Sequence, residues 1–252
     1  ALLSRLKLEG NRTSADVVLG LDTSLIAEAQ ATELLAPHGL NTDAIDLAVT
    51  WSDPYFLPYD FGYFGFVYDS EKIQTPPKTL KDLMLNPDSP LVIIQDPRTS
   101  TPGLGLILWA RKVFGDKDID AWEKFAAKIV TVTKGWSEAY GLFLKGEAPM
   151  VLSYTTSPAY HRHIENSERY RVAMFDDGHY QQVEVVARLA SSKNPTLAQD
   201  FLSFMLSDDV QKILPTTNWM LPAVKTGQPL PEAFKESEIP KVILDFTPEE
   251  VS

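Results

Sequence analysis

Residues 90–115 read PLVIIQDPRTSTPGLGLILWARKVFG, and this stretch decides the fold class. The apolar run at 90–96 predicts a strand, and 101–115 predicts a helix. Pro102 then stands in the first helical turn, where its missing N–H is not needed, and Gly115 stands just past the helix end. A strand, a polar turn and a buried helix therefore follow one another in a single segment.

The same alternation of strand and helix continues in both directions along the chain. Repeated alternation of this kind predicts an α/β fold with mainly parallel sheets. The expected strands are 16–22, 45–51, 63–69, 90–96, 128–133, 149–155, 170–175 and 179–190. The expected helices are 23–35, capped by Thr23 or Ser24, then 78–85, 101–115, 118–129, 137–146, 157–166, capped by Ser157, and 196–207 and 207–215, with one more from residue 1 to Gly10.

Two of these strands are candidates for crossings between two lobes. Segment 179–190 is longer than a median strand, and the aromatic run 63–69 is the candidate for the outbound crossing. The Pro- and charge-rich segment 225–244 is expected to be a surface loop. These crossings predict an inserted second lobe, residues 63–185, and a discontinuous first lobe, residues 1–62 plus 186–252.

Composition and motifs argue against several classes of function. The net charge is −11, which repels phosphate backbones and argues against a nucleic-acid partner. The chain has no cysteine, which excludes disulfides, thiol catalysis and Cys-ligated metals. No GxSxG, HExxH or Walker A pattern occurs, and the two histidines of HRH (161–163) diverge on an expected helix. A binding protein is therefore favoured over an enzyme.

Two expected helix starts carry clusters of hydroxyl side chains. Thr99, Ser100 and Thr101 precede the helix at Pro102, and SYTTSPAY (153–160) has the same form. A helix N-terminus suits an anion, and ligands of open α/β sheets bind beyond the carboxyl ends of the strands. Gly103, just inside the first helix, could also let a ligand approach the backbone closely. Capping by Ser100 or Thr101 explains the first cluster equally well.

Two tryptophans stand in polar surroundings. Trp136 lies in TKGWSEAY and Trp219 in TTNWMLPA, whereas Trp109 and Trp122 lie in apolar helices. Aromatic faces suit flat ligands and attract cations by about 0.5–2 kcal/mol each. Burial in a core remains the alternative for either ring.

Four segments closely resemble the thiamine-binding periplasmic proteins of bacterial ABC importers: QDPRTSTPGLGL, TVTKGWSEAYGLFLKGE, VLSYTTSPAY and NWM. The resemblance runs from SRLKLEG to LDFTPEEV, over nearly the whole chain. It implies a two-lobed type II periplasmic-binding-protein fold with a hinge, a periplasmic location and no catalysis. The implied ligands are thiamine, thiamine monophosphate and thiamine diphosphate, with no cofactor or metal. The implied partner is a membrane permease, and the protein is expected to be a monomer.

The resemblance also implies the residues that contact the ligand. Ser100 and Thr101 match positions at the phosphate or hydroxyethyl end. A second contact strip consists of Tyr154, Thr155, Thr156 and Ser157. The aromatic positions around the rings are Trp136, Tyr160 and Trp219.

The sequence departs from that family at both ends. The family's first strand and helix precede position 1, and PEE at 248–250 looks like the first turn of its C-terminal helix. The chain is therefore expected to be a piece of a longer protein. One alternative is a binder of ferric ion or another small cation, although no adjacent tyrosines occur. A thiamine- or pyrimidine-processing enzyme is a second alternative, although such enzymes generally need Cys or a His-rich site.

Overall fold

A computed structural model describes residues 2–48 and 50–246, which form two compact units. The first unit comprises Ala1–Phe61, Gln182–Pro231 and Phe246–Ser252, of which the structure describes residues 2–48, 50–61, 182–231 and 246. The second unit comprises Gly62–Gln181 and Glu232–Asp245. Two long strands, β3 (Leu57–Asp69) and β8 (His179–Leu189), contribute residues to both units. No helix among the described residues combines the length and apolar character that crossing a bilayer requires.

The second unit contains a mixed sheet in which β3, β6, β4 and β5 are neighbours in that order. Strand β4 is parallel to both β5 and β6, whereas β3 is antiparallel to β6 and β7. Short strand β10 (Ile243–Leu244) runs parallel to the start of β8. The remaining bounds are β4 (Val92–Gln95), β5 (Ile129–Thr133), β6 (Met150–Tyr154) and β7 (Tyr170–Ala173).

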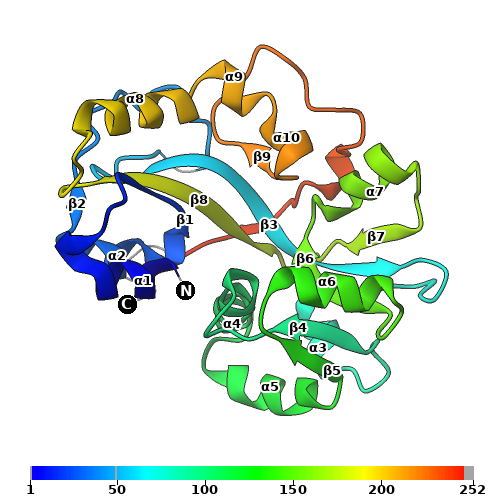
Figure 1. The fold of residues 1–252 in the computed structure, drawn as a ribbon. Helices are drawn as coiled ribbons and strands as arrows, with labels where there is room; N and C mark the ends of the chain where they lie inside the picture. Colours follow the sequence, from blue (N-terminus) through cyan, green and yellow to red (C-terminus); the bar gives the residue numbers. More distant parts are fainter. Residues whose placement is uncertain (1, 49, 247–252) are drawn as a thin grey trace. The chain divides into compact units, whose positions relative to one another are not determined.

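Helices α3 (Leu80–Leu85), α4 (Thr101–Phe114), α5 (Asp118–Ala126) and α6 (Trp136–Leu144) lie around β4 and β5, and α7 (Ser157–Glu165) lies beside β7 (Figure 1). Short 3-10 turns occur at Gly115–Lys117 and Glu236–Glu238. Trp109 of α4 is fully buried, and its ring lies 5.6 Å from that of Phe175 and 6.1 Å from that of Phe66. Its indole N–H donates to the Gly178 carbonyl at 3.0 Å, so the polar atom of this core residue is satisfied.

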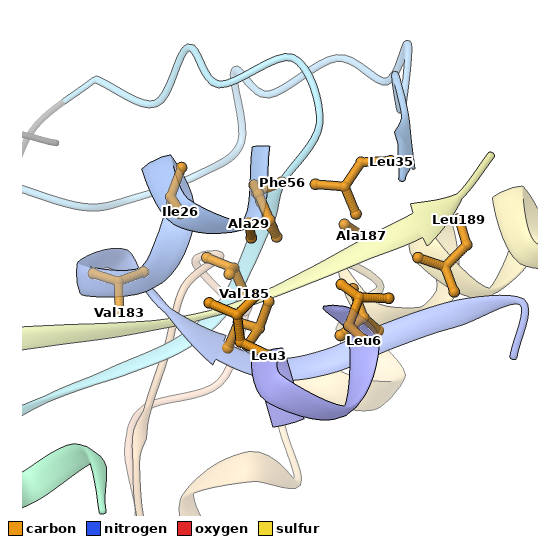
Figure 2. Packing of buried hydrophobic residues seen from close by; sticks show 12 residues of the cluster. Leu3, Leu6, Ile26, Ala29, Leu35, Phe56, Val183, Val185, Ala187 and Leu189 are labelled. Atoms are coloured by element: carbon orange, nitrogen blue, oxygen red, sulfur yellow. The ribbon is translucent and has the colours of Figure 1, made fainter. Parts of the chain in front are cut away.

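The first unit packs apolar layers on the two faces of β8. Every second residue of β8 lies on one face, and on that face Val183, Val185 and Ala187 belong to the same hydrophobic cluster as Leu3 and Leu6 of helix α1 (Figure 2). Val186, on the other face, belongs to a cluster with residues of α8 and α10. The elements are α1 (Leu2–Glu9), a 3-10 turn Gly10–Arg12, β1 (Val17–Asp22), a 3-10 turn Thr23–Leu25, α2 (Ile26–Gln30), β2 (Leu35–Ala36), α8 (Pro195–Met205), α9 (Asp208–Gln211), α10 (Leu214–Thr217) and β9 (Leu221–Pro222).

The α/β class is confirmed, but the prediction of mainly parallel sheets is wrong. Strands β1 and β2 run antiparallel to β8, and β6, β7 and β9 run antiparallel to β3. The long strands β3 and β8 cause this difference, because most of their neighbours lie far away in the sequence and run in the opposite direction. Alternation along the chain fixes element type but carries no information about such pairings.

Two element predictions in the first unit are also wrong. The described residues of 45–51 form no strand beyond a single bridge between Ile45 and Val224. The predicted helix 23–35 is a 3-10 turn followed by one short helix, because Leu35 instead pairs with β8. The side chain of Asp22, rather than that of Thr23 or Ser24, accepts the N-terminal N–H, at 2.8 Å from Ser24.

Segment 225–244 is largely irregular as expected, except for its 3-10 turn and the pairing of β10 with β8. The turn predicted at 248–250 lies outside the described residues.

Candidate ligand-binding site

Three strands of the second unit lead directly into helices at one edge of the sheet. Strand β4 is followed by α4, β5 by α6 and β6 by α7, and the three strands are parallel neighbours. Their carboxyl ends therefore meet at the same edge, which we call the carboxyl edge. Each helix presents its unpaired N-terminal N–H groups and its positive dipole end there. Such an edge is where open α/β sheets bind polar ligands.

The turn before α4 differs from the predicted capping arrangement. Ser100 occupies the N-cap with extended backbone (φ −136°, ψ 131°), but its side chain makes no capping hydrogen bond. The backbone carbonyl of Ser100 accepts from Leu104 at 3.1 Å, so the helix starts without the hydroxyl. Thr99 donates its hydroxyl to the Lys134 carbonyl at 2.7 Å, which ties this turn to the one before α6. The capping explanation for Ser100 is therefore wrong, while Thr101 begins the helix half-buried.

Gly103 is required by packing within the unit. A Cβ at this position would lie 2.5 Å from the Gln95 carbonyl oxygen and 2.8 Å from the Asp96 carbonyl carbon. A Cβ at Gly105 would lie 2.1 Å from the ring of Phe64. The room left by the two missing side chains is thus filled by β4 and β3. On the sides where a Cβ would point, the expectation that this glycine-rich turn makes room for a ligand is therefore wrong.

Trp136 is held at the carboxyl edge by a chain of serine hydroxyls. It is the first residue of α6, remains 38% exposed, and donates its indole N–H to the Ser153 hydroxyl at 2.7 Å. The Ser153 and Ser157 hydroxyls lie 2.7 Å apart, and Ser157 also accepts from the Tyr154 N–H at 3.2 Å. Sequence reasoning missed Ser153, although it stands inside SYTTSPAY.

Thr155 and Thr156 follow β6 and are both buried. Thr156, not Ser157 as predicted, occupies the N-cap of α7. Their hydroxyl oxygens, and the side-chain oxygen of Gln95 at the end of β4, are buried without a hydrogen-bond partner among the described residues. An unpaired buried polar atom costs about 1–3 kcal/mol. The carboxyl edge therefore carries hydrogen-bonding capacity that the described residues do not use.

The two tyrosines predicted for this site differ in exposure. Tyr154 is half-buried against the ring of Phe64, with the centroids 5.2 Å apart. Tyr160 on α7 is 37% exposed, and its ring meets His161 edge-on at 5.2 Å. All predicted contact residues except Trp219 thus belong to the second unit, on or next to its carboxyl edge.

Trp219 belongs to the first unit and has an unusual backbone conformation. Its φ is +57°, which is rare for a bulky side chain and costs about 1–3 kcal/mol. Its N–H donates to Leu214 at 3.2 Å, and the neighbouring Asn218 side chain donates to Asp60 at 2.6 Å and to Glu184 at 3.3 Å. Backbone strain of this kind is most common at functional positions, which is consistent with the prediction that Trp219 contacts the ligand.

Buried Asp60 and half-buried Glu184 form a carboxyl pair that sequence reasoning missed. Asp60 is fully buried, and one of its oxygens has no partner among the described residues. Burial, and then the nearby charge of Glu184, hold the pKa of Asp60 well above its usual range. Glu184 accepts from the Tyr59 hydroxyl at 3.0 Å. The pair was missed because the two carboxyls lie on strands that are far apart in the sequence.

The raised pKa of Asp60 predicts a specific pH dependence of stability. The unfolded chain releases this proton near the usual carboxyl pKa, whereas the native state keeps it to higher pH. The unfolding free energy therefore falls as pH rises through that range. We expect Asp60→Asn to remove this fall and to exceed the wild type by about 1 kcal/mol or more at pH 8. Urea unfolding at pH 5, 6.5 and 8 measures the effect, with the exposed Asp200→Asn as control. Equal pH slopes for all three proteins would contradict it.

No group of three or more His, Cys, Asp or Glu side chains in the described ranges is arranged to hold a metal ion. The carboxyl edge instead offers hydroxyl groups, helix N-termini and an exposed indole, which suit a ligand with a flat ring and oxygen atoms.

Comparison with known proteins gives concordant matches. The family model for bacterial extracellular solute-binding proteins matches residues 3–212. A thiamine-binding periplasmic protein of Escherichia coli (strain K12) is 54% identical over 252 residues, covering 100% of this chain and 76% of the relative. A solved periplasmic thiamin binding protein, also 54% identical, superimposes with a TM-score of 0.96 over 99% of this chain and 78% of its own. Iron-bound HitA from Pseudomonas aeruginosa, 23% identical with a TM-score of 0.80, covers 99% of this chain and 82% of its own and shares the fold.

Proposed function

The chain belongs to the bacterial extracellular solute-binding protein family, and from this premise we propose that it binds thiamine or its phosphate esters and delivers them to the permease of an ABC importer. The observation that carries the proposal is the combination at the carboxyl edge of a half-exposed indole, Trp136, with three helix N-termini and their hydroxyl residues. Two relatives that are 53% and 54% identical to this chain are thiamine-binding periplasmic proteins, which supports the proposal. Because the family is one of binding proteins, the role is transport without catalysis.

The chemistry of thiamine matches these groups. Its thiazolium ring carries a permanent positive charge and its aminopyrimidine is flat, so the faces of Trp136 and Tyr160 suit both rings. The hydroxyethyl or phosphate end suits Ser100, Thr101 and the hydroxyls of Thr155, Thr156 and Ser157, beside the positive helix ends. The net charge of −11 favours a cationic ligand.

We propose the type II periplasmic-binding arrangement for the whole molecule. The first lobe comprises residues 1–62 plus 186–252, the second comprises residues 63–185, and the ligand lies in a hinged cleft between them. Trp219 then completes the ring contacts from the first lobe, and Tyr154 extends the strip on the second. A periplasmic location, a monomeric state and the absence of a cofactor belong to the same proposal.

Calorimetric titration with thiamine, thiamine monophosphate and thiamine diphosphate tests the function. We expect saturable binding of at least one of them, and Trp136→Ala should weaken it by about 10- to 100-fold through the lost ring contact. Trp122→Ala, on α5 and away from the carboxyl edge, is the matched control. Absence of binding by the wild type at millimolar concentrations of all three compounds would refute the proposal.

A substitution at Ser100 should affect the affinity for the phosphate esters more than the affinity for thiamine itself. Since its hydroxyl makes no capping bond, Ser100→Ala should leave the melting temperature nearly unchanged. Loss of a hydrogen bond to a charged phosphate is worth about 1.5–3 kcal/mol, so affinity for the esters should fall about tenfold or more, and more than affinity for thiamine. The same titrations measure this difference, with Ser203→Ala of α8 as control. An equal loss for all three ligands would argue against a phosphate contact.

A further inference from the structure

Behind Trp136, three side chains from α6 and α7 form a hydrogen-bonded chain, which we call the His161 triad (Tyr140, His161 and Glu165). His161 is fully buried, although it carries no role in the ligand contacts described above. Its Nδ1 lies 2.7 Å from a Glu165 carboxylate oxygen, and its Nε2 lies 2.9 Å from the Tyr140 hydroxyl. Both imidazole nitrogens are therefore paired, and although the Glu165 side chain is 42% exposed, such a hydrogen-bonded chain fixes side-chain orientations.

The direction of each hydrogen bond follows from the chemistry of the partners. The Glu165 carboxylate can only accept, so Nδ1 carries the proton of the neutral imidazole and Nε2 is the acceptor. Burial raises the pKa of Tyr140 far above its usual value, so the phenol retains the proton that it donates to Nε2. Protonated His161 would donate from both nitrogens, so the Tyr140 oxygen would accept from Nε2 and the Tyr140 proton would lose its present acceptor.

The triad is in direct contact with the candidate binding residue. The ring of Tyr140 stacks on that of Trp136 with centroids 5.1 Å apart and an interplanar angle of 27°. The two residues are four positions apart on α6 and share one face of the helix. Besides this stack, the indole is held by its hydrogen bond to Ser153. The hydroxyl of Tyr140 therefore controls how the ring behind Trp136 is held.

The remaining contacts of His161 come from two neighbouring elements. Tyr170 of β7 lies 4.4 Å from the imidazole, and Tyr160 of α7 meets it edge-on. The charged groups beyond Tyr170 are Arg169, 5.4 Å from that ring, and its carboxylate partners on β3 and the following turn, Asp69 at 2.7 Å and Glu71 at 3.2 Å. Glu165 is the carboxylate that bonds His161 directly.

We propose that the His161 triad positions the Trp136 ring for the ligand, and that protonation of His161 loosens this arrangement and weakens binding at acid pH. This inference rests on the proposed function, because Trp136 must face the ligand for its orientation to matter. Its first part concerns the ligand-free protein and can be measured without thiamine.

The ligand-free test uses 19F NMR of protein labelled with 5-fluorotryptophan. The signal missing from Trp136→Phe identifies this ring among the five tryptophans. Between pH 7.5 and 5.5 that signal should shift in the wild type and in the control His163→Gln, whose residue is exposed on α7. It should not shift with pH in Tyr140→Phe, which keeps the stack, or in His161→Gln, whose amide does not titrate. A pH shift of equal size in all four proteins would overturn the proposal, and so would no shift in any.

The ligand test measures thiamine affinity in the same variants at both pH values. Wild type and His163→Gln should bind thiamine about three- to tenfold more weakly at pH 5.5, whereas Tyr140→Phe should bind several-fold more weakly at pH 7.5 and show no further loss. His161→Gln should recover most of the affinity at pH 7.5 and show no pH dependence, which a purely structural role would not produce. If thiamine binds no protein but the 19F pattern holds, the proposed function fails and the positioning of Trp136 stands. If all variants bind thiamine like the wild type at both pH values, the positioning role fails and the function stands.

Discussion

Gly103→Ala is expected to lower the unfolding free energy by about 3 kcal/mol, at the upper end of the usual range for overpacking. The added Cβ would lie 2.5 Å from the Gln95 carbonyl oxygen and 2.9 Å from that of Asp96. Both neighbours are backbone atoms, so no side-chain rotation can relieve the contact. Either α4 moves away from β4 or the end of the strand is distorted. Each response displaces Ser100 and Thr101, so affinity for thiamine phosphates should fall as well.

Gly141 provides the matched control for this prediction. It lies inside α6, and a Cβ there would meet nothing within 4 Å. Because alanine has the higher helix propensity, Gly141→Ala should raise the unfolding free energy by up to about 1 kcal/mol. Urea unfolding followed by circular dichroism compares the two variants. Changes of the same sign and size would show that close packing of α4 on β4 is not what requires glycine at position 103.

Glu238→Gln is expected to cost about 3–5 kcal/mol, since it leaves a buried guanidinium without its counter-charge. Arg162 of α7 donates two hydrogen bonds to Glu238, at 2.8 and 2.5 Å, and a third to the Ala233 carbonyl at 2.7 Å. The two side chains are only 7% and 12% exposed. This pair holds segment 232–245 against the helix that carries Tyr160.

A second ion pair on the same segment gives the control. Lys235 and Glu168 are 2.7 Å apart, but their side chains are 43% and 54% exposed. Glu168→Gln should therefore cost no more than about 1 kcal/mol. The double variant Arg162→Met, Glu238→Leu should be less destabilised than Glu238→Gln, because no charge remains buried. Thermal and urea unfolding measure all three. Equal losses for Glu238→Gln and Glu168→Gln would mean that burial of the first pair contributes nothing.

Local sequence patterns were sufficient to predict much of the secondary structure of the second unit. The run at 90–115 becomes β4 and α4 with nearly the predicted bounds, and Gly115 ends the helix with φ +58°. Such signals are local, because caps, glycine at positive φ and apolar periodicity depend on neighbouring residues. Segment 45–51 shows the limit, since an apolar run becomes a strand only where a partner strand is available. Its one bridge, from Ile45 to Val224, is to a residue far away in the sequence.

The candidate site divides along the same line. The strand–helix pattern predicts that several contact residues lie at one edge of the sheet, because their strands are parallel neighbours. These residues are Ser100, Thr101, Trp136 and the 154–157 strip. The bond between Trp136 and Ser153 joins different elements and could not be predicted. The Asp60–Glu184 pair was missed for the same reason. The sequence alone suggests a ligand beside Gly103 because it does not show that the end of β4 already fills the space next to it.

Because the last residues of the second unit come from 232–245, the order of synthesis constrains how the molecule folds. Residues 62–181 are synthesised before Glu238, so the guanidinium of Arg162 must wait for its counter-charge until segment 232–245 has followed. In the first unit, β1 likewise waits for β8. Neither unit can be finished from an N-terminal stretch alone. A nascent chain that lacks segment 232–245 should therefore leave the second unit incomplete and accessible to chaperones until that segment follows.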